Sequence, residues 1–346
     1  MKAKDATIGA QLATAEMISS GTIGFVDQYF FADEIAEVVY QSGMKALINP
    51  SIFDGKPMGF HFSLESSYRK NLEVINKWHR KDDRVFVGFG PHAPYSVPDD
   101  YYQKIYEQAE KYDTKIHTHL NETKQEVDES KKAHGKSPIQ KMQDLGVLDR
   151  IVAAHCIHLD ENDKQLLVQH HIPVLHNIQS NLKIGAGIAN IPDYISRGII
   201  VCLGTDGNAS NNNLDMLEEV RLTALIHKGL HGNPKLIPAR TALKMGTENA
   251  SSIFPPGIYS GKLLKGEPAD LLVVDLDRIN TTPIINPLSN WVYSANSSNV
   301  ALTMSNGKIL YSDNKFQTLN VERIKEQAQK SIERMMIESD YQKETP

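Results

Sequence analysis

The stretch GIIVCLGTDGNASNNN, residues 198–213, decides the fold. Its unbroken apolar run, ended by glycines, is typical of a strand buried on both faces in a parallel sheet. Asp206 would then lie just past the carboxyl end of that strand, where barrels build their active sites. A helix over residues 214–228 should follow, with Asn213 as its cap. Taken alone, Asp206 fits equally well as a turn residue favoured by its flanking glycines.

Composition narrows the class of protein. A chain of 346 residues holds one large domain, or one large and one small. The net charge of −5 and the lack of a long Lys/Arg cluster argue against a nucleic-acid partner. No apolar run approaches the ~18 residues of a membrane span, so no membrane association is expected. Cys156 and Cys202 lie in apolar runs and form no CxxC motif, which predicts a reducing, cytoplasmic location.

Strands and helices are expected to alternate along the chain, which predicts an α/β fold with a parallel sheet. The expected strands are residues 22–29, 45–52, 84–90, 115–119, 150–155, 172–176 and 198–204. None is followed by a GxGxxG or P-loop, which counts against a nucleotide-binding fold. A closed barrel needs eight strands. This chain opens on a helix over residues 4–20 and supplies one strand too few.

The character of the sequence changes after the barrel-like part. A strand over residues 269–275 and a hairpin over 300–312, turning at Asn306-Gly307, predict a small β domain. A charged amphipathic helix over residues 321–336 and a loose tail follow. The predicted division is a barrel over residues 1–257, a β portion over 258–320, and a C-terminal helix and tail over 321–346.

Histidines and acids collect at the predicted strand ends. In HTHLNE, His117 and His119 share one face of a strand, and Glu122 lies in the following loop. His92, His155 and His176 each lie at or just past the end of another strand, and a barrel gathers such positions onto one rim. A single histidine there is more often a hydrogen-bonded core residue, and HxH alone is weak. The recurrence on four successive strands, followed by Asp206, favours a metal or polar catalytic site.

The residue types at this rim indicate a particular chemistry. Imidazoles with one carboxylate suit Zn²⁺ or Fe²⁺ better than Mg²⁺, which prefers oxygen ligands. Such an ion lowers the pKa of a bound water. Asp206 is placed to take the water's proton, and Glu122 to pass one to a leaving group.

Five segments resemble, in order and spacing, the amidohydrolase superfamily. They are GFGPHAPY, HTHLNET, AAHCIHL, HNIQSNLKIGAGIA and LGTDGNASNNNLDMLEEVRLTAL. The branch they are most similar to contains the 5-methylthioadenosine/S-adenosylhomocysteine deaminases and their chlorohydrolase-like relatives. The resemblance implies a metal-dependent (β/α)8 TIM-type barrel with a C-terminal β-sandwich portion. It also implies a small-molecule substrate and C–N bond hydrolysis, in which an adenine amine becomes a carbonyl and ammonia is released.

The resemblance also implies roles for individual residues. His119 and Asp206 would be ligands of one Zn²⁺ or Fe²⁺ per chain, and Asp206 would also accept a proton. Glu122 would contact the purine ring and shuttle protons, and His155 would orient the attacking water. His92 would contact the substrate, and Ser210 and His176 are candidates for the pocket wall.

Two departures from the family pattern bear on activity. The family's first strand carries an HxH pair of metal ligands that has no equivalent in this sequence, so the first βα unit of the barrel is expected to be missing. The segments near Ser51 and Ser66 lack arginines that some members use to bind the substrate's ribose or carboxylate. Three alternatives follow: an adenosine-type deaminase, a truncated and catalytically impaired homologue, or another reaction such as guanine-type deamination or dechlorination. A homo-oligomer is left open, and weak or absent activity of this chain by itself is expected.

Overall fold

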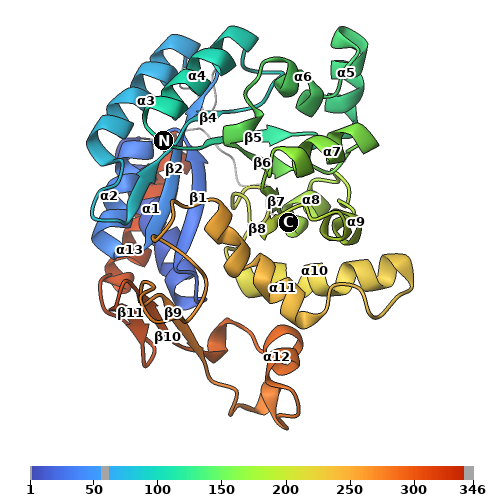
Figure 1. Ribbon diagram of the computed structural model, residues 1–346. Coiled ribbons are helices and arrows are strands. Elements are labelled where there is room, and N and C mark those ends of the chain that lie inside the picture. The colour runs from blue at the N-terminus through green and yellow to red at the C-terminus, as the bar shows by residue number, and fades with distance from the viewer. Residues whose placement is uncertain (1, 56–61, 339–346) are drawn as a thin grey trace.

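The computed structural model describes residues 2–55 and 62–338, and its centre is a ring of parallel strands (Figure 1). The strands are β1 (Gly24–Tyr29), β2 (Lys45–Ile52), β3 (Val85–Val87), β4 (Gly90–Pro91), β5 (Ile116–Leu120), β6 (Ile151–His155), β7 (Val174–His176) and β8 (Val201–Leu203). They form two sheets, β1-β2-β3 with β4 on β2, and β5-β6-β7-β8, in which every pair is parallel. The predicted α/β class with a parallel sheet is therefore confirmed.

The two sheets meet where the predicted strand 84–90 is broken. Phe89 bridges to Ile116, and the His117 amide donates a 2.9 Å hydrogen bond to the Phe89 carbonyl. The break lies where the pairing changes: the Gly88 amide donates to the Ile48 carbonyl of β2, and the Phe89 amide donates to the Lys115 carbonyl just before β5. An added Cβ at Gly88 would lie 2.3 Å from Oδ1 of Asn49 and 2.6 Å from the Lys115 carbonyl oxygen, so only glycine fits at this point.

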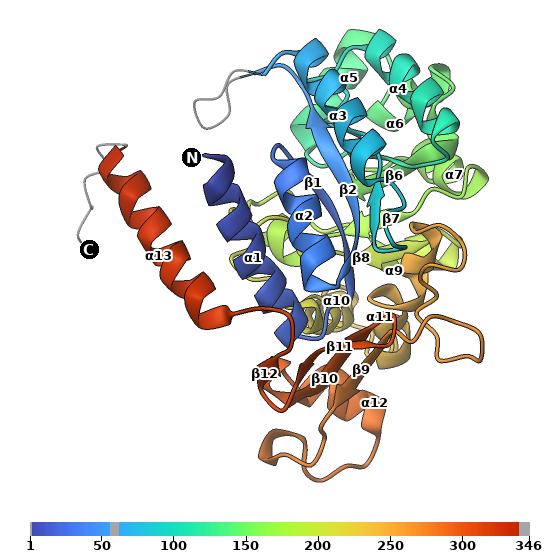
Figure 2. The ribbon, with the colours of Figure 1, turned by 90° about the vertical axis from the view of Figure 1, so that its left-hand side faces the viewer.

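Helices cover the outside of the barrel (Figures 1 and 2). They are α1 (Ala3–Ser19), α2 (Ala32–Ser42), α3 (Leu64–Trp78), α4 (Asp99–Lys111), α5 (Lys124–His134), α6 (Pro138–Asp144), α7 (Glu161–Gln169), α8 (Ile178–Lys183), α9 (Ile191–Ser196), α10 (Met216–His231) and α11 (Ala239–Met245). The start of α10 corrects one prediction. Asp215 caps this helix by accepting a 2.9 Å hydrogen bond from the Leu217 amide, whereas the Asn213 amide donates to Glu218.

The small C-terminal sheet is antiparallel, with the order β12-β11-β10-β9. Its strands are β9 (Leu271–Val274), β10 (Val300–Ser305), β11 (Lys308–Ser312) and β12 (Lys315–Phe316). Asn306 and Gly307 both have positive φ, at 48° and 73°, which confirms the predicted hairpin turn. The described residues give one sheet here rather than the two layers of a sandwich. Buried Lys45, at the start of β2, pairs with Asp270 beside β9, so this sheet lies at the amino end of the barrel.

The last helix, α13 (Val321–Glu338), lies along α1 (Figure 2). Ser331 and Arg334 of α13 both donate hydrogen bonds to the Asp5 carboxylate of α1, and this pair of donors holds the two helices together. The helix continues two residues beyond its predicted end at 336, and the rest of the predicted tail, residues 339–346, is outside the described residues. No described helix is long and apolar enough to cross a bilayer.

Candidate active site

His119 lies at the centre of the rim, on β5. Its Nδ1 lies 2.6 Å from the carbonyl oxygen of His92, so this nitrogen carries the proton and donates. The Nε2 lone pair is therefore left available for a metal or a substrate. Burial and then the nearby His155 lower the pKa of His119, which keeps the imidazole neutral.

His155 and Glu122 lie on one side of His119. The His155 ring stacks on that of His119, with centroids 5.4 Å apart, and its Nδ1 is 2.9 Å from Oδ1 of Asn181. Its Nε2 lies 3.7 Å from Glu122 Oε1, which is too long for a direct hydrogen bond. His155 is only 1% exposed. Its Nδ1 is hydrogen-bonded to Asn181, and its Nε2 faces Glu122.

Asp206 lies beyond the end of β8, as predicted, and both of its carboxylate oxygens are held by donors. Ser180 and Ser210 donate to Oδ2 at 2.6 and 3.0 Å, and the Gly207 amide donates to Oδ1 at 2.8 Å. Burial acts to raise the pKa of Asp206. The hydrogen bond from Ser180 and the charge of His155 outweigh it and hold that pKa below its usual value. Asp206 is therefore an ionised carboxylate at neutral pH.

The two remaining predicted histidines, His92 and His176, lie in different surroundings. His92 lies at the rim, 4.9 Å from the His119 ring between centroids, and burial lowers its pKa to about 4. His176 is fully buried and lies against His227 of α10, with ring centroids 6.2 Å apart. Of the predicted site residues, His119, Asp206 and Ser210 line the large cavity at the rim, whereas Glu122, His92, His155 and His176 are not among its lining residues. The role of His176 in the pocket wall stays a prediction.

A cavity of about 1060 Å³ opens at this rim. Its upper part is lined by His117, His119, Asp206 and Ser210. The His117 ring is 8% exposed, and neither of its nitrogens has a hydrogen-bond partner among the described residues. Burial lowers the pKa of His117 to about 3, so this imidazole is neutral as well.

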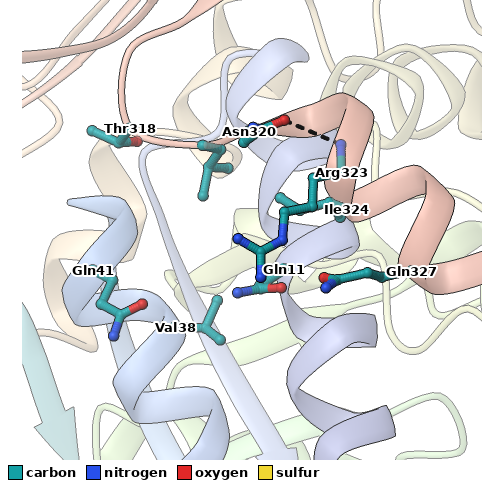
Figure 3. Close-up of a pocket in the computed structure, with 9 residues that line it drawn as sticks. Gln11, Val38, Gln41, Thr318, Asn320, Arg323, Ile324 and Gln327 are labelled. Atoms are coloured by element: carbon teal, nitrogen blue, oxygen red, sulfur yellow. Dashed lines mark hydrogen bonds between the residues drawn. The ribbon is translucent and has the colours of Figure 1, made fainter.

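A second hollow, of about 210 Å³, lies between α1, α2 and the start of α13 (Figure 3). Its polar lining residues are Gln11, Gln41, Thr318, Asn320, Arg323 and Gln327. None of its lining residues is a histidine, cysteine or carboxylate, so it offers no acid, base or metal ligand. The candidate catalytic residues are therefore those at the barrel rim.

Sequence reasoning missed three residues that build the site. Ser180 and Asn181 at α8 hold Asp206 and His155, as described above. Asn211 donates to the Thr205 carbonyl at 2.8 Å and to Glu219 at 3.0 Å, and thereby fixes the loop that carries Asp206. The sequence does hold a signal for these residues, because the polar segments HNIQSN and SNNN come just after two predicted strand ends.

The residues present do not make a complete metal site. Catalytic zinc sites use three protein ligands and a water. His119 and Asp206 are suitable donors, yet no group of three or more His, Cys, Asp or Glu residues converges on one point within residues 2–55 and 62–338. The chain by itself therefore does not fit the metal that the sequence resemblance implies.

Comparisons with known proteins agree with this fold. The model of the "Amidohydrolase family" matches residues 1–310. A 5-methylthioadenosine/S-adenosylhomocysteine deaminase of Dictyoglomus thermophilum is 39% identical over 333 residues, which cover 95% of this chain and 76% of the relative. A 5'-deoxyadenosine deaminase of Methanosarcina barkeri is 36% identical over 340 residues, which cover 97% and 77%. A zinc-bound adenosine deaminase from Xanthomonas campestris superposes with a TM-score of 0.91 at 30% identity, covering 97% and 76%.

The chain belongs to the amidohydrolase family, among deaminases that act on C–N bonds. Its fold is the α/β barrel of that family. It spans about three quarters of the length of these relatives. About a quarter of each relative therefore has no counterpart in this chain.

Proposed function

We propose that this site performs hydrolytic deamination of an adenosine-type substrate, such as S-adenosylhomocysteine or 5-methylthioadenosine. The observation that carries the proposal is the gathering of Glu122, His155 and Asp206 near His119. The His155 ring stacks on His119, Glu122 lies 3.7 Å from His155 Nε2, and the charges of Glu122 and Asp206 both act to raise the pKa of His119. Two carboxylates near a buried imidazole supply the proton acceptor and the proton donor that C–N hydrolysis needs.

In the proposed reaction, water adds to the ring carbon that bears the amine. Asp206 takes the proton from the water, and Glu122 protonates the ring nitrogen beside that carbon. His155 orients the water, and His92 contacts the substrate. Asp206 then passes its proton to the amine, and the C–N bond breaks to release ammonia. The hydroxyl proton of the adduct returns to Glu122 as the ring carbon keeps the oxygen as a carbonyl. The balance is one water consumed and one ammonia released.

A Zn²⁺ or Fe²⁺ ion would acidify the water, with His119 and Asp206 among its ligands. Because the described residues hold no complete set of ligands, we propose that this chain by itself is weakly active or inactive. The proposal includes the finer fold assignment, a TIM-type (β/α)8 barrel with a C-terminal β-sandwich portion. The division at residues 257/258 and 320/321 and the cytoplasmic location remain predictions. Nothing in the geometry favours guanine-type deamination or dechlorination.

The test is ammonia release from 5-methylthioadenosine, S-adenosylhomocysteine and 5'-deoxyadenosine with added zinc. It should be run on the purified chain and on its Glu122→Gln variant. We expect slow turnover of at least one substrate, lost in Glu122→Gln. Ammonia release that Glu122→Gln leaves unchanged, or none from any of the three substrates by a chain that retains about one equivalent of zinc, would show that the proposed function is wrong.

A further inference from the structure

Three phenylalanines meet at the carboxyl end of the barrel strands, beside the candidate active site. Phe30 follows β1, Phe53 follows β2, and Phe62 directly precedes Ser63, the N-cap of α3. The Phe30 ring lies 5.1 Å from each of the other two between centroids, and it stacks on Phe62 with an interplanar angle of 19°. The centroids of Phe53 and Phe62 are 5.8 Å apart. We call these three rings the aromatic cluster.

Hydrogen bonds to the backbone hold two of these rings in place. Phe62 and Gly55 exchange two backbone hydrogen bonds, at 2.9 and 3.0 Å, as an isolated antiparallel bridge. The Ser67 hydroxyl of α3 donates to the Phe53 carbonyl at 3.3 Å. The cluster is therefore preorganised, and a ligand that packs on it pays little for ordering the protein.

The aromatic cluster adjoins the proposed catalytic residues through His92. The ring centroids of Phe53 and His92 are 6.2 Å apart, and those of His92 and His119 are 4.9 Å apart. The Phe30 ring also lies 5.2 Å from Tyr29, which lines the 1060 Å³ cavity. A ligand bound at His119 thus has aromatic surface within reach on one side.

Strand order places the cluster on the side of His119 away from Glu122. β5, which carries His119, has β4 on one side and β6 on the other, because the His119 amide donates to the His92 carbonyl at 3.1 Å and β6 pairs with β5 in parallel. His92 follows β4, whereas Glu122 faces His155 at the end of β6. In the proposed reaction Glu122 protonates the purine nitrogen beside the amine. The ribose is attached to the other ring of the purine, so its 5' substituent lies toward His92 and the cluster.

The exposure of the cluster differs from that of phenylalanines that only support the fold. Phe86 and Phe89, which pack in apolar clusters of the barrel, are 1% and 0% exposed. All three rings of the aromatic cluster are half-buried. Aromatic side chains that line a site next to a few polar groups are typical of small-molecule pockets. The aromatic cluster therefore has ring surface left for a ligand.

The charges around the aromatic cluster favour a neutral ligand group. Arg69 of α3 and Lys104 of α4 both pair with Glu65, at 2.6 and 3.4 Å. Over the three rings themselves, residues 2–55 and 62–338 place no lysine or arginine. Asp54, next to Phe53 in the chain, adds a negative charge. A ligand carboxylate at this position would be partly desolvated without a partner, which is costly.

We propose that the aromatic cluster is the subsite for the 5' substituent of the substrate and selects a small apolar group there. The methylthio group of 5-methylthioadenosine fits this chemistry, because a thioether packs favourably with its sulfur about 5 Å from an aromatic ring. The methyl group of 5'-deoxyadenosine fits it as well. S-Adenosylhomocysteine would bring the charged amino-acid end of its side chain to the same rings and is disfavoured. The identity of the nucleoside rests on the proposed function, whereas the preference for an apolar group rests on the cluster.

The test compares the binding of 5-methylthioadenosine and S-adenosylhomocysteine. Calorimetry is run on the purified full chain in EDTA, so that neither compound is consumed. We expect 5-methylthioadenosine to bind at least fivefold more tightly. Phe53→Ala should weaken its binding at least fivefold and change that of S-adenosylhomocysteine less than twofold, so the preference disappears.

Two further variants locate the effect. Phe316→Ala is the matched control, because Phe316 is a half-buried phenylalanine of β12 that packs on Tyr311, 5.1 Å away, in the small sheet. It should change the binding of neither compound. Phe53→Arg places a cation in the subsite and should shift the preference at least fivefold toward S-adenosylhomocysteine. Thermal melts show that each variant is folded.

Equal affinity of the wild type for the two compounds would overturn the proposal, and so would a Phe53→Ala loss that is the same for both. Either result leaves the deaminase assignment standing. A preference that depends on Phe53, together with failure of the ammonia-release test above, would overturn the deaminase assignment alone. Binding of neither compound would overturn both, because the nucleoside would then be the wrong class of ligand.

Discussion

The Ser180 hydroxyl donates a 2.6 Å hydrogen bond to Oδ2 of Asp206, and this bond joins the start of α8 to the loop after β8. It links a residue that sequence reasoning missed to the acid on which the proposed chemistry depends. Because Asp206 is held ionised by this donor and the charge of His155, the bond contributes to folding as well as to the site.

Ser180→Ala is expected to lower the free energy of unfolding by about 1 to 3 kcal/mol at pH 7, the usual range for a hydrogen bond to a charged group. The folded-state pKa of Asp206 lies below its unfolded value, so this stability is present above the unfolded pKa and is lost as the pH falls. The difference from wild type should therefore shrink at pH 3. Chemical denaturation checks this, with Ser196→Ala as the control, because the exposed Ser196 hydroxyl donates only to the Asp193 carbonyl. An equal loss in both variants would contradict the assignment.

Gly204 and Gly207 flank Asp206 and provide a matched test of packing at the rim. A Cβ at Gly204 would lie 2.5 Å from Oδ1 of Asn177, whereas a Cβ at Gly207 would meet nothing within 4 Å. Gly204→Ala is expected to destabilise the fold by about 1 to 3 kcal/mol, as overpacking does, and Gly207→Ala by much less. Thermal melts of the two variants give the comparison. Similar melting temperatures of the two variants would show that Asn177 moves away from the new methyl group with little loss of stability.

Asp27 on β1 gives a prediction for pH dependence. It lines the 1060 Å³ cavity, its Oδ2 has no partner among the described residues, and burial raises its pKa to about 7. Asp27 in the unfolded chain ionises from about pH 4, so the stability of the wild type falls relative to Asp27→Asn as the pH rises from 4 to 7. We expect the variant to be more stable by about 4 kcal/mol at pH 7.5 and about equal at pH 4. Urea unfolding at both values checks this, and a constant difference would contradict it.

Lys45 and Asp270 join the barrel to the small sheet. Their side chains are 1% and 7% exposed, and Lys45 also donates to the Ile258 carbonyl at 2.6 Å. Lys45→Met leaves the Asp270 carboxylate buried without its partner and should cost about 3 to 5 kcal/mol. Lys45→Met combined with Asp270→Leu should recover much of that loss. A double variant as unstable as the sum of the two singles would show that the pair is not coupled.

The sequence predicted the elements well where a single local signal sets them. Unbroken apolar runs placed the barrel strands, and Asn306-Gly307 placed the hairpin. The predictions failed where a distant contact decides. The break at Gly88 depends on the approach of the Lys115 carbonyl, and the cap of α10 depends on which of Asn213 and Asp215 reaches a free amide.

The site was predicted in outline for the same reason. Parallel strands bring their carboxyl ends to one rim, so His92, His119, His155 and Asp206 were foreseeable from strand ends alone. His176 also ends a strand, but it packs against α10. No local sequence pattern shows whether a histidine at a strand end points to the rim or to the helices. Ser180 and Asn181 act through contacts with residues 26 positions away, which a single sequence does not reveal.

The metal content of the purified chain tests the central claim most directly. The account predicts well below one equivalent of zinc or iron per chain after incubation with excess metal and desalting. About one tightly held metal ion in the chain alone, lost in His119→Ala, would contradict the account and show that these residues complete a site without help.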